Sequence, residues 1–243
     1  RRRVKKFLNF QNIILIGILL IAIFLRFWNL SQVPPSTSMD EASISYNAYS
    51  VSKIGVDEYG QTPIFSHRSY DDWRRATYLY FVVPFVSSFG LITVAVRIPA
   101  AILSVLTIWF LYLIVLSLFT KKSISAYVLA LLSAFLLAIS PWHIYISRIG
   151  HESNAYLSFF VFAVMFLLRG GKKNIFISVP LFILAMVSYY AGQALVPTFI
   201  LGVLLIFRKE LFLNFLRDKK LIIIALILFV LVGVIMKGLF SPE

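Results

Sequence analysis

Long apolar stretches alternate with short polar or basic segments along most of the chain. A helix that crosses a membrane needs about 20 apolar residues. The segments that reach or approach this length are residues 11–29, 93–119, 124–140, 154–168, 175–191, 194–207 and 221–240. The pattern therefore predicts an all-α, polytopic integral membrane protein with about seven transmembrane helices, forming a single membrane domain over residues 1–243.

The composition agrees with lipid as the main solvent. The 243 residues are 60% hydrophobic and have a mean hydropathy of +0.89, which is more apolar than a soluble domain needs to be. The absence of Cys excludes disulfides, thiolate metal sites and a Cys nucleophile. The net charge of +13 is spread over short runs between apolar segments, so we expect no nucleic-acid partner.

The basic runs also predict an orientation. Residues 1–6, 121–122, 169–173 and 208–220 hold most of the 23 Lys and Arg, and they occupy every second connection between spans. Basic loops stay in the cytoplasm, so the N-terminus is predicted to be cytoplasmic and residues 30–92, 141–153 and 192–193 extracytoplasmic. The first run and the apolar segment after it are interpreted as a retained signal anchor. The chain begins at Arg1, not Met, and we expect it to be part of a longer protein.

The first outer loop, residues 30–92, is far longer than a simple connection, and loops of this length usually carry function. Residues 40–54 place apolar side chains at helical spacing beside polar ones, which predicts a short amphipathic helix on the membrane. Residues 76–87 are a second candidate, with aromatic side chains typical of a headgroup interface. The loop is therefore expected to carry juxtamembrane helices.

Asp40 and Glu41 stand at the start of the first of these helices and are the candidate catalytic residues. Backbone N–H groups at a helix N-terminus favour an ionised carboxylate. Such a carboxylate can accept a proton from an incoming hydroxyl, as a general base does. The alternative is that Asp40 is only the helix N-cap.

Residues 140–154 bring Arg148, His151 and Glu152 to the same predicted side. Glu152 could join Asp40 around a divalent cation or a phosphate-bearing substrate, whereas the alternative is an interfacial anchor. Arginine binds phosphate through its planar fork. The outer-side arginines are therefore candidates for a phosphate site, with headgroup snorkelling as the alternative; they are Arg68, Arg74, Arg75, Arg97 and Arg148. Tyr189 and Tyr190 end the fifth span on this side and could line the same surface.

The order of these segments resembles that of the membrane-embedded C-type glycosyltransferases. The outer Asp40-Glu41 is followed by Ala95-Val96-Arg97-Ile98-Pro99, by Ser140-Pro141-Trp142-His143 with Ser147-Arg148-Ile149-Gly150-His151-Glu152, and by Ser188-Tyr189-Tyr190 with Ala194-Leu195-Val196-Pro197. The chain is most similar to the bacterial and archaeal relatives of the protein O-mannosyltransferases and the lipid A aminoarabinose transferase, and looks like their N-terminal portion.

The resemblance implies a glycosyltransferase in a prokaryotic plasma membrane. It would move a sugar from a polyprenyl-phosphate carrier to a hydroxyl of a protein, lipid or glycan acceptor at the extracytoplasmic face. In this family the acid matched by Asp40 is the base, the acid matched by Glu152 is the second acid, and the residue matched by Arg74 binds the lipid phosphate. Arg75, Arg148, His151, Tyr189 and Tyr190 are further candidate substrate-binding residues, and Glu152 with Asp40 is the candidate site for a divalent cation.

Two other functions are compatible with the sequence. A non-enzymatic lipid transporter or flippase would need a polar path through the bilayer, and the predicted spans carry almost no ionisable residues. A fragment or degenerate paralogue would have the fold without the activity.

Overall fold

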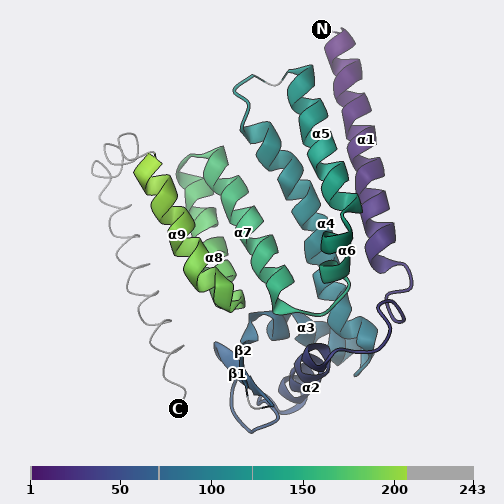
Figure 1. Cartoon of the computed structure of the whole chain (residues 1–243), viewed down its shortest axis with the longest axis vertical. Coiled ribbons are helices and arrows are strands. Elements are labelled where there is room, and N and C mark those ends of the chain that lie inside the picture. Colours follow the sequence, from purple (N-terminus) through teal and green to yellow (C-terminus); the bar gives the residue numbers. More distant parts are fainter. Residues whose placement is uncertain (1, 71, 122, 207–243) are drawn as a thin grey trace.

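The computed structural model describes residues 2–70, 72–121 and 123–206, and this part of the chain is almost entirely helical (Figure 1). Its elements are α1 (Arg2–Phe27), α2 (Met39–Ile54), β1 (Ser66–Ser69), β2 (Asp72–Arg75), α3 (Ala76–Phe89), α4 (Thr93–Ser117), α5 (Ile124–Ile139), α6 (Pro141–Ser147), α7 (Glu152–Arg169), α8 (Lys172–Ser188) and α9 (Tyr190–Ile206). The predicted all-α class is confirmed. The short antiparallel hairpin of β1 and β2 was not predicted.

The long helices stand side by side, and the elements of the first outer loop gather at one end of them (Figure 1). α4 packs against α1, α5 and α7, and α8 packs against α7 and α9. α2, α3 and the hairpin lie at the lower end of the view, where α1 ends and where α4 and α7 begin. Both predicted loop helices are therefore present, as α2 and α3.

The predicted number of spans is not confirmed. Three of the described helices are long and apolar enough to cross a membrane, namely α1 through its segment Phe10–Phe27, α4 and α7. A fourth is added if α5 and α6, which meet at a bend of 60°, count as one broken span. α8 and α9 have 17 residues each, which is short for a full crossing. The seventh predicted span, 221–240, lies outside the described residues.

Two apolar clusters form the interior. One lies between α1, α4 and α5, and the other joins α2 and α3 to α4, α7 and α8. Side-chain hydrogen bonds add to the packing of α4 against α7: Ser104 donates to Asn154 over 3.0 Å, and Thr107 donates to Ser158 over 2.8 Å. Such bonds between helices contribute of the order of 1 kcal/mol in a membrane. They hold the beginning of α7, where Glu152 lies, against α4.

Two helix breaks occur at the same end of the bundle as α2 and α3. α5 ends at Ser140 because Pro141 has no N–H and disfavours a helical residue before it, and α6 then starts in a new direction. α8 ends at Tyr189, whose backbone is extended, with φ of −155° and ψ of 146°. The breaks place irregular backbone and polar side chains beside the first-loop elements.

Candidate active site at one end of the bundle

Four polar residues from three parts of the chain meet where α2, β2 and the start of α7 come together. Arg74 Nη2 lies 2.6 Å from Asp40 Oδ1, and Arg74 Nη1 lies 3.6 Å from Glu152 Oε1. The other carboxylate oxygen of Asp40, Oδ2, lies 3.3 Å from His151 Nε2. Asp40, Arg74, His151 and Glu152 are called the Asp40 cluster below. The Asp40 side chain is 31% exposed and that of Glu152 only 5%, so the cluster opens to solvent on the Asp40 side.

The start of α2 sets the direction of Asp40. Ser38 is the N-cap: its hydroxyl accepts a hydrogen bond from the Glu41 N–H, and the Glu41 carboxylate accepts one from the Ser38 N–H. This reciprocal pair is a capping box. The alternative that Asp40 is itself the N-cap is therefore wrong. Because the cap is made by other residues, the Asp40 carboxylate is free to bind Arg74.

His151 is held in one tautomer by the beginning of α7. Its Nδ1 accepts a hydrogen bond from the backbone N–H of Ser153 over 3.1 Å, which makes His151 the N-cap of that helix. In a neutral imidazole the other nitrogen then carries the proton. His151 Nε2–H is therefore directed at Asp40, and both Asp40 oxygens have a donor beside them.

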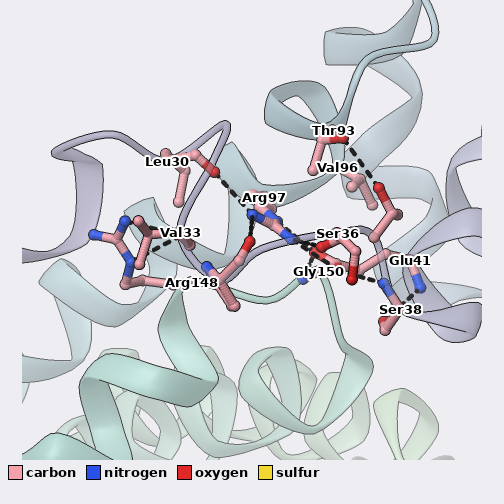
Figure 2. A network of polar contacts seen from close by, with 12 residues as sticks. Leu30, Val33, Ser36, Ser38, Glu41, Thr93, Val96, Arg97, Arg148 and Gly150 are labelled. Atoms are coloured by element: carbon pink, nitrogen blue, oxygen red, sulfur yellow. Dashed lines mark hydrogen bonds and ion pairs between the residues drawn. The ribbon is translucent and has the colours of Figure 1, made fainter.

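Glu41 has a different environment from its neighbour Asp40. Its side chain is 1% exposed and pairs with Arg97 of α4, whose Nε lies 2.6 Å from Glu41 Oε1 (Figure 2). Burial alone would raise the pKa of Glu41. The hydrogen bonds from Arg97, Ser38 and Gly150, together with the Arg97 charge, outweigh burial, and the pKa is lowered below its usual value. Glu41 is thus a fully engaged, ionised residue of the interior.

Arg97 also binds the segment that leads from α1 into α2. Its guanidinium donates to the carbonyl oxygens of Leu30 and Ser36 over 3.0 and 2.8 Å (Figure 2). It also donates to the carbonyl oxygen of Pro34 over 3.0 Å. These contacts, together with the Glu41 pair, are called the Arg97 network below. The network fixes the chain on both sides of the α2 cap, and therefore the position from which the Asp40 side chain projects.

Gly150 connects the Arg97 network to the rest of the Asp40 cluster. Its N–H donates to Glu41 Oε1 over 3.0 Å, immediately before His151 and Glu152. A Cβ at this position would lie 2.8 Å from the carbonyl oxygen of Val96, too close for any side chain. The close approach of the two backbones therefore requires glycine. Through Gly150, Glu41 holds together the two segments that carry the acids of the cluster.

Of the five arginines predicted as candidates for a phosphate site, only Arg74 belongs to the cluster. Arg75 projects from the opposite face of β2 from Arg74, and its guanidinium lies 4.3 Å from the centre of the Tyr190 ring. With the Gln193 amide oriented to satisfy both groups, Gln193 accepts from Arg75 as well. These contacts tie the hairpin to α9.

Arg148 binds backbone at the end of α1. It donates over 2.7 Å to the carbonyl oxygens of Leu25 and Trp28, and over 2.9 Å to that of Val33. Of the two predicted tyrosines, Tyr190 is with Arg75, whereas the Tyr189 ring packs edge-on against His151, with 5.9 Å between the ring centres.

The predicted metal site has few ligands. Within the described ranges, no group of three or more His, Asp or Glu side chains is close enough together to hold a metal ion. The Arg74 guanidinium contacts both Asp40 and Glu152, so a cation shared by the two carboxylates would have to displace it. The divalent cation stays a prediction, and no step below depends on it.

The Arg97 network and the separate roles of Asp40 and Glu41 were not predicted from the sequence. One signal was available, because Ser38 followed three residues later by Glu41 is the pattern of a capping box. The partner Arg97 lies 56 positions further along and no local pattern indicates it.

A comparison with protein families identifies the chain. The model of the dolichyl-phosphate-mannose-protein mannosyltransferase family matches residues 77–236. The chain belongs to this family. It is therefore a C-type glycosyltransferase of the mannosyltransferase type, as the resemblance implied. Its long apolar helices agree with an integral membrane protein. The match covers His151, Glu152 and Tyr189 but begins after Asp40 and Arg74. No curated protein and no solved structure matches the chain.

Proposed function

We propose that the chain transfers a sugar from a polyprenyl-phosphate carrier to an acceptor hydroxyl at the extracytoplasmic membrane face. In this proposal Asp40 is the general base and Arg74 binds the phosphate of the donor. The observation that carries it is the Asp40 cluster itself, in which a partly exposed carboxylate contacts a guanidinium that also reaches a buried second acid. Family membership favours this enzyme over a lipid transporter.

The distribution of charge supports the extracytoplasmic side. Lys121 follows α4, and Arg169, Lys172 and Lys173 flank the turn between α7 and α8. Both turns lie at the opposite end of the long helices from α2 and α3 (Figure 1). Basic connections are retained in the cytoplasm. The Asp40 cluster then faces outward, beside the membrane surface where a lipid-linked sugar presents its phosphate.

The proposed reaction is a single displacement. The acceptor hydroxyl gives its proton to an Asp40 oxygen, and the acceptor oxygen forms a bond to the anomeric carbon of the sugar. The bond from that carbon to the phosphate oxygen breaks, and the polyprenyl phosphate leaves with the electron pair. Arg74 stabilises the charge that develops on the leaving phosphate. Because the attack is direct, the sugar inverts its configuration.

The Asp40–Arg74 pair implies an order of binding. With a contact of 2.6 Å, Arg74 occupies one Asp40 oxygen. A donor phosphate competes with Asp40 for the same guanidinium, since arginine binds phosphate through two N–H groups at once. Donor binding therefore releases Asp40 to accept the proton. In this proposal Glu41 and Arg148 are positioning residues that hold the segments around the cluster.

The test is the release of polyprenyl phosphate from polyprenyl-phosphate mannose, with an extract of the cell envelope as the source of acceptor. Asp40→Asn in the folded, full-length protein should lower kcat on the order of 10²–10⁴-fold, as the loss of a general base does. Arg74→Gln should raise the KM for the donor. Asp72→Asn is the matched control, because it neutralises an exposed acid of the same hairpin. Near wild-type turnover by Asp40→Asn would reject Asp40 as the base.

A further inference from the structure

His67 lies directly behind Arg74 in the hairpin. The register pairs His67 of β1 with Arg74 of β2, so the two side chains project from the same face of the hairpin, with Cβ atoms about 5 Å apart. Ser69 projects from this face as well, and both His67 and Ser69 are buried, at 0% and 1% exposure. A fully buried histidine beside a functional arginine needs a reason, because burial of an imidazole is costly unless it is hydrogen-bonded.

The polar atoms of this region are buried without partners, yet they are complementary. Five of them have no hydrogen-bond partner in the part of the chain that the structure describes: Asp57 Oδ2, His67 Nδ1, His67 Nε2, Ser69 Oγ and Arg74 Nε. Asp57 Oδ2 only accepts, Arg74 Nε only donates, and a neutral imidazole offers one donor and one acceptor. A neutral His67 matches an acceptor on Asp57 and a donor on Arg74 at once, through bridging water, and the Ser69 hydroxyl can take either role. A protonated ring would instead turn a second donor toward Arg74.

The charges around the ring agree with this arrangement. Burial lowers the pKa of His67 to about 4, the Asp57 charge opposes that shift, and the Arg74 charge adds to it. Three elements pack against β1, namely α2, α3 and β2. Their charged and titratable side chains are Asp40, Glu41, Tyr46, Tyr49, Lys53, Asp72, Arg74, Arg75, Tyr78 and Tyr80. Of these, Arg74 is the one whose charge lowers the pKa of His67.

We propose that neutral His67 is a positioning residue for Arg74. Through bridging water it accepts a hydrogen bond from Arg74 Nε and donates one to Asp57, and in this way it fixes the direction in which the guanidinium reaches Asp40 and Glu152. The inference rests on the proposed function in one respect, namely that Arg74 binds the donor phosphate. The link between His67 and Arg74 stands on the hairpin register and on the unpaired atoms.

The first experiment measures binding of a short-chain polyprenyl monophosphate, and donor kinetics, for full-length protein in lipid nanodiscs. His67→Phe keeps a ring of similar size and removes both nitrogens. It should weaken polyprenyl phosphate binding about ten-fold, the effect of losing a hydrogen bond to a charged group, and raise the donor KM with little change in kcat. His67→Gln retains one donor and one acceptor and should stay within about three-fold of wild type. Equal binding by wild type and the Phe variant, or a Gln variant as weak as Phe, would overturn the proposal.

A second experiment does not depend on the donor. The chain has three histidines, so ¹⁵N NMR of labelled imidazoles can be assigned by substitution. His67 should be neutral at pH 6, with one protonated and one unprotonated nitrogen, and the unprotonated signal should shift in Arg74→Gln. A charged His67 at pH 6, or a spectrum unchanged in Arg74→Gln, would overturn the link. If the NMR link holds while Arg74→Gln binds polyprenyl phosphate normally, the proposed donor site fails and the positioning role of His67 survives.

Discussion

Replacing Arg97 should destabilise the protein more than any substitution of an exposed charge. Arg97→Met removes a guanidinium that is 0% exposed and that makes five hydrogen bonds, two to Glu41 and three to backbone carbonyl oxygens. The methionine fills a similar space but can satisfy none of these groups. The Glu41 carboxylate, at 1% exposure, then stays in the interior without its counter-ion.

The size of the effect follows from that stranded carboxylate. Breaking a buried ion pair by removing one partner costs about 3–5 kcal/mol. Glu41 keeps the N–H groups of Ser38 and Gly150, which partly stabilise its charge, so we expect the lower end of the range, about 3 kcal/mol. Adding Glu41→Gln should recover about 1 kcal/mol, because a buried neutral amide costs less than a buried unpaired charge.

The measurement is reversible unfolding in mixed detergent micelles, followed by circular dichroism. Lys53→Met, an exposed position at the end of the same helix as Glu41, serves as the control and should stay within about 0.5 kcal/mol of wild type. The reasoning is refuted if Arg97→Met unfolds within about 1 kcal/mol of wild type. It is also refuted if the double variant is less stable than Arg97→Met alone.

Gly150→Ala should lower the unfolding midpoint and the rate of sugar transfer together, because its Cβ meets the Val96 carbonyl; an unchanged rate would show that the two backbones can separate freely. The His67 pKa of about 4, against 6.5 in the unfolded chain, means that the unfolded state binds more protons between these values. Lowering the pH from 6.5 to 4 should therefore remove up to about 3 kcal/mol of stability in wild type, and the loss should shrink in His67→Phe; identical pH–stability curves would contradict this. Arg75→Met should lower the unfolding midpoint but change polyprenyl phosphate binding less than Arg74→Gln does; the reverse order of binding effects would return Arg75 to the donor site.

The sequence predicted the positions of the helices well, but it did not predict how many of them cross the membrane. Apolar length and period were enough to locate α1, α4, α5 and α7, and the two surface helices α2 and α3. The number of spans was not recoverable in the same way. The break between α5 and α6 depends on one proline, and α8 and α9 are close to the minimum length, so hydropathy alone does not decide whether each crosses the bilayer.

The hairpin was missed for a physical reason. β1 and β2 have four residues each, and charged or polar side chains occupy most of both strands. A two-stranded ribbon is marginal on its own, so its stability comes from tertiary contacts that local propensity does not record. Tyr190, for example, donates to the carbonyl oxygen of Trp73 from 117 positions along the chain.

The candidate site could be predicted as a set of residues but not as a set of partners. Asp40, Arg74, His151 and Glu152 were all singled out from residue type and predicted side, and the structure brings them together. Their catalytic roles stay predictions. Arg148 was chosen by the same reasoning and instead binds the end of α1. Residue type identifies a group able to bind phosphate, but only packing decides whether backbone carbonyls already occupy it.

Once the N-cap of α2 is known, helical periodicity explains why the adjacent acids Asp40 and Glu41 have different environments. Successive residues of a helix project about 100° apart, so two adjacent carboxylates leave the helix in different directions. With Ser38 as the N-cap, Glu41 is at the third helical position, where a capping box directs its carboxylate back toward the cap. Asp40 must then project elsewhere, and it meets Arg74. Two neighbouring residues of like charge thus have different environments, one an ion pair in the interior and the other a carboxylate open to solvent and to substrate.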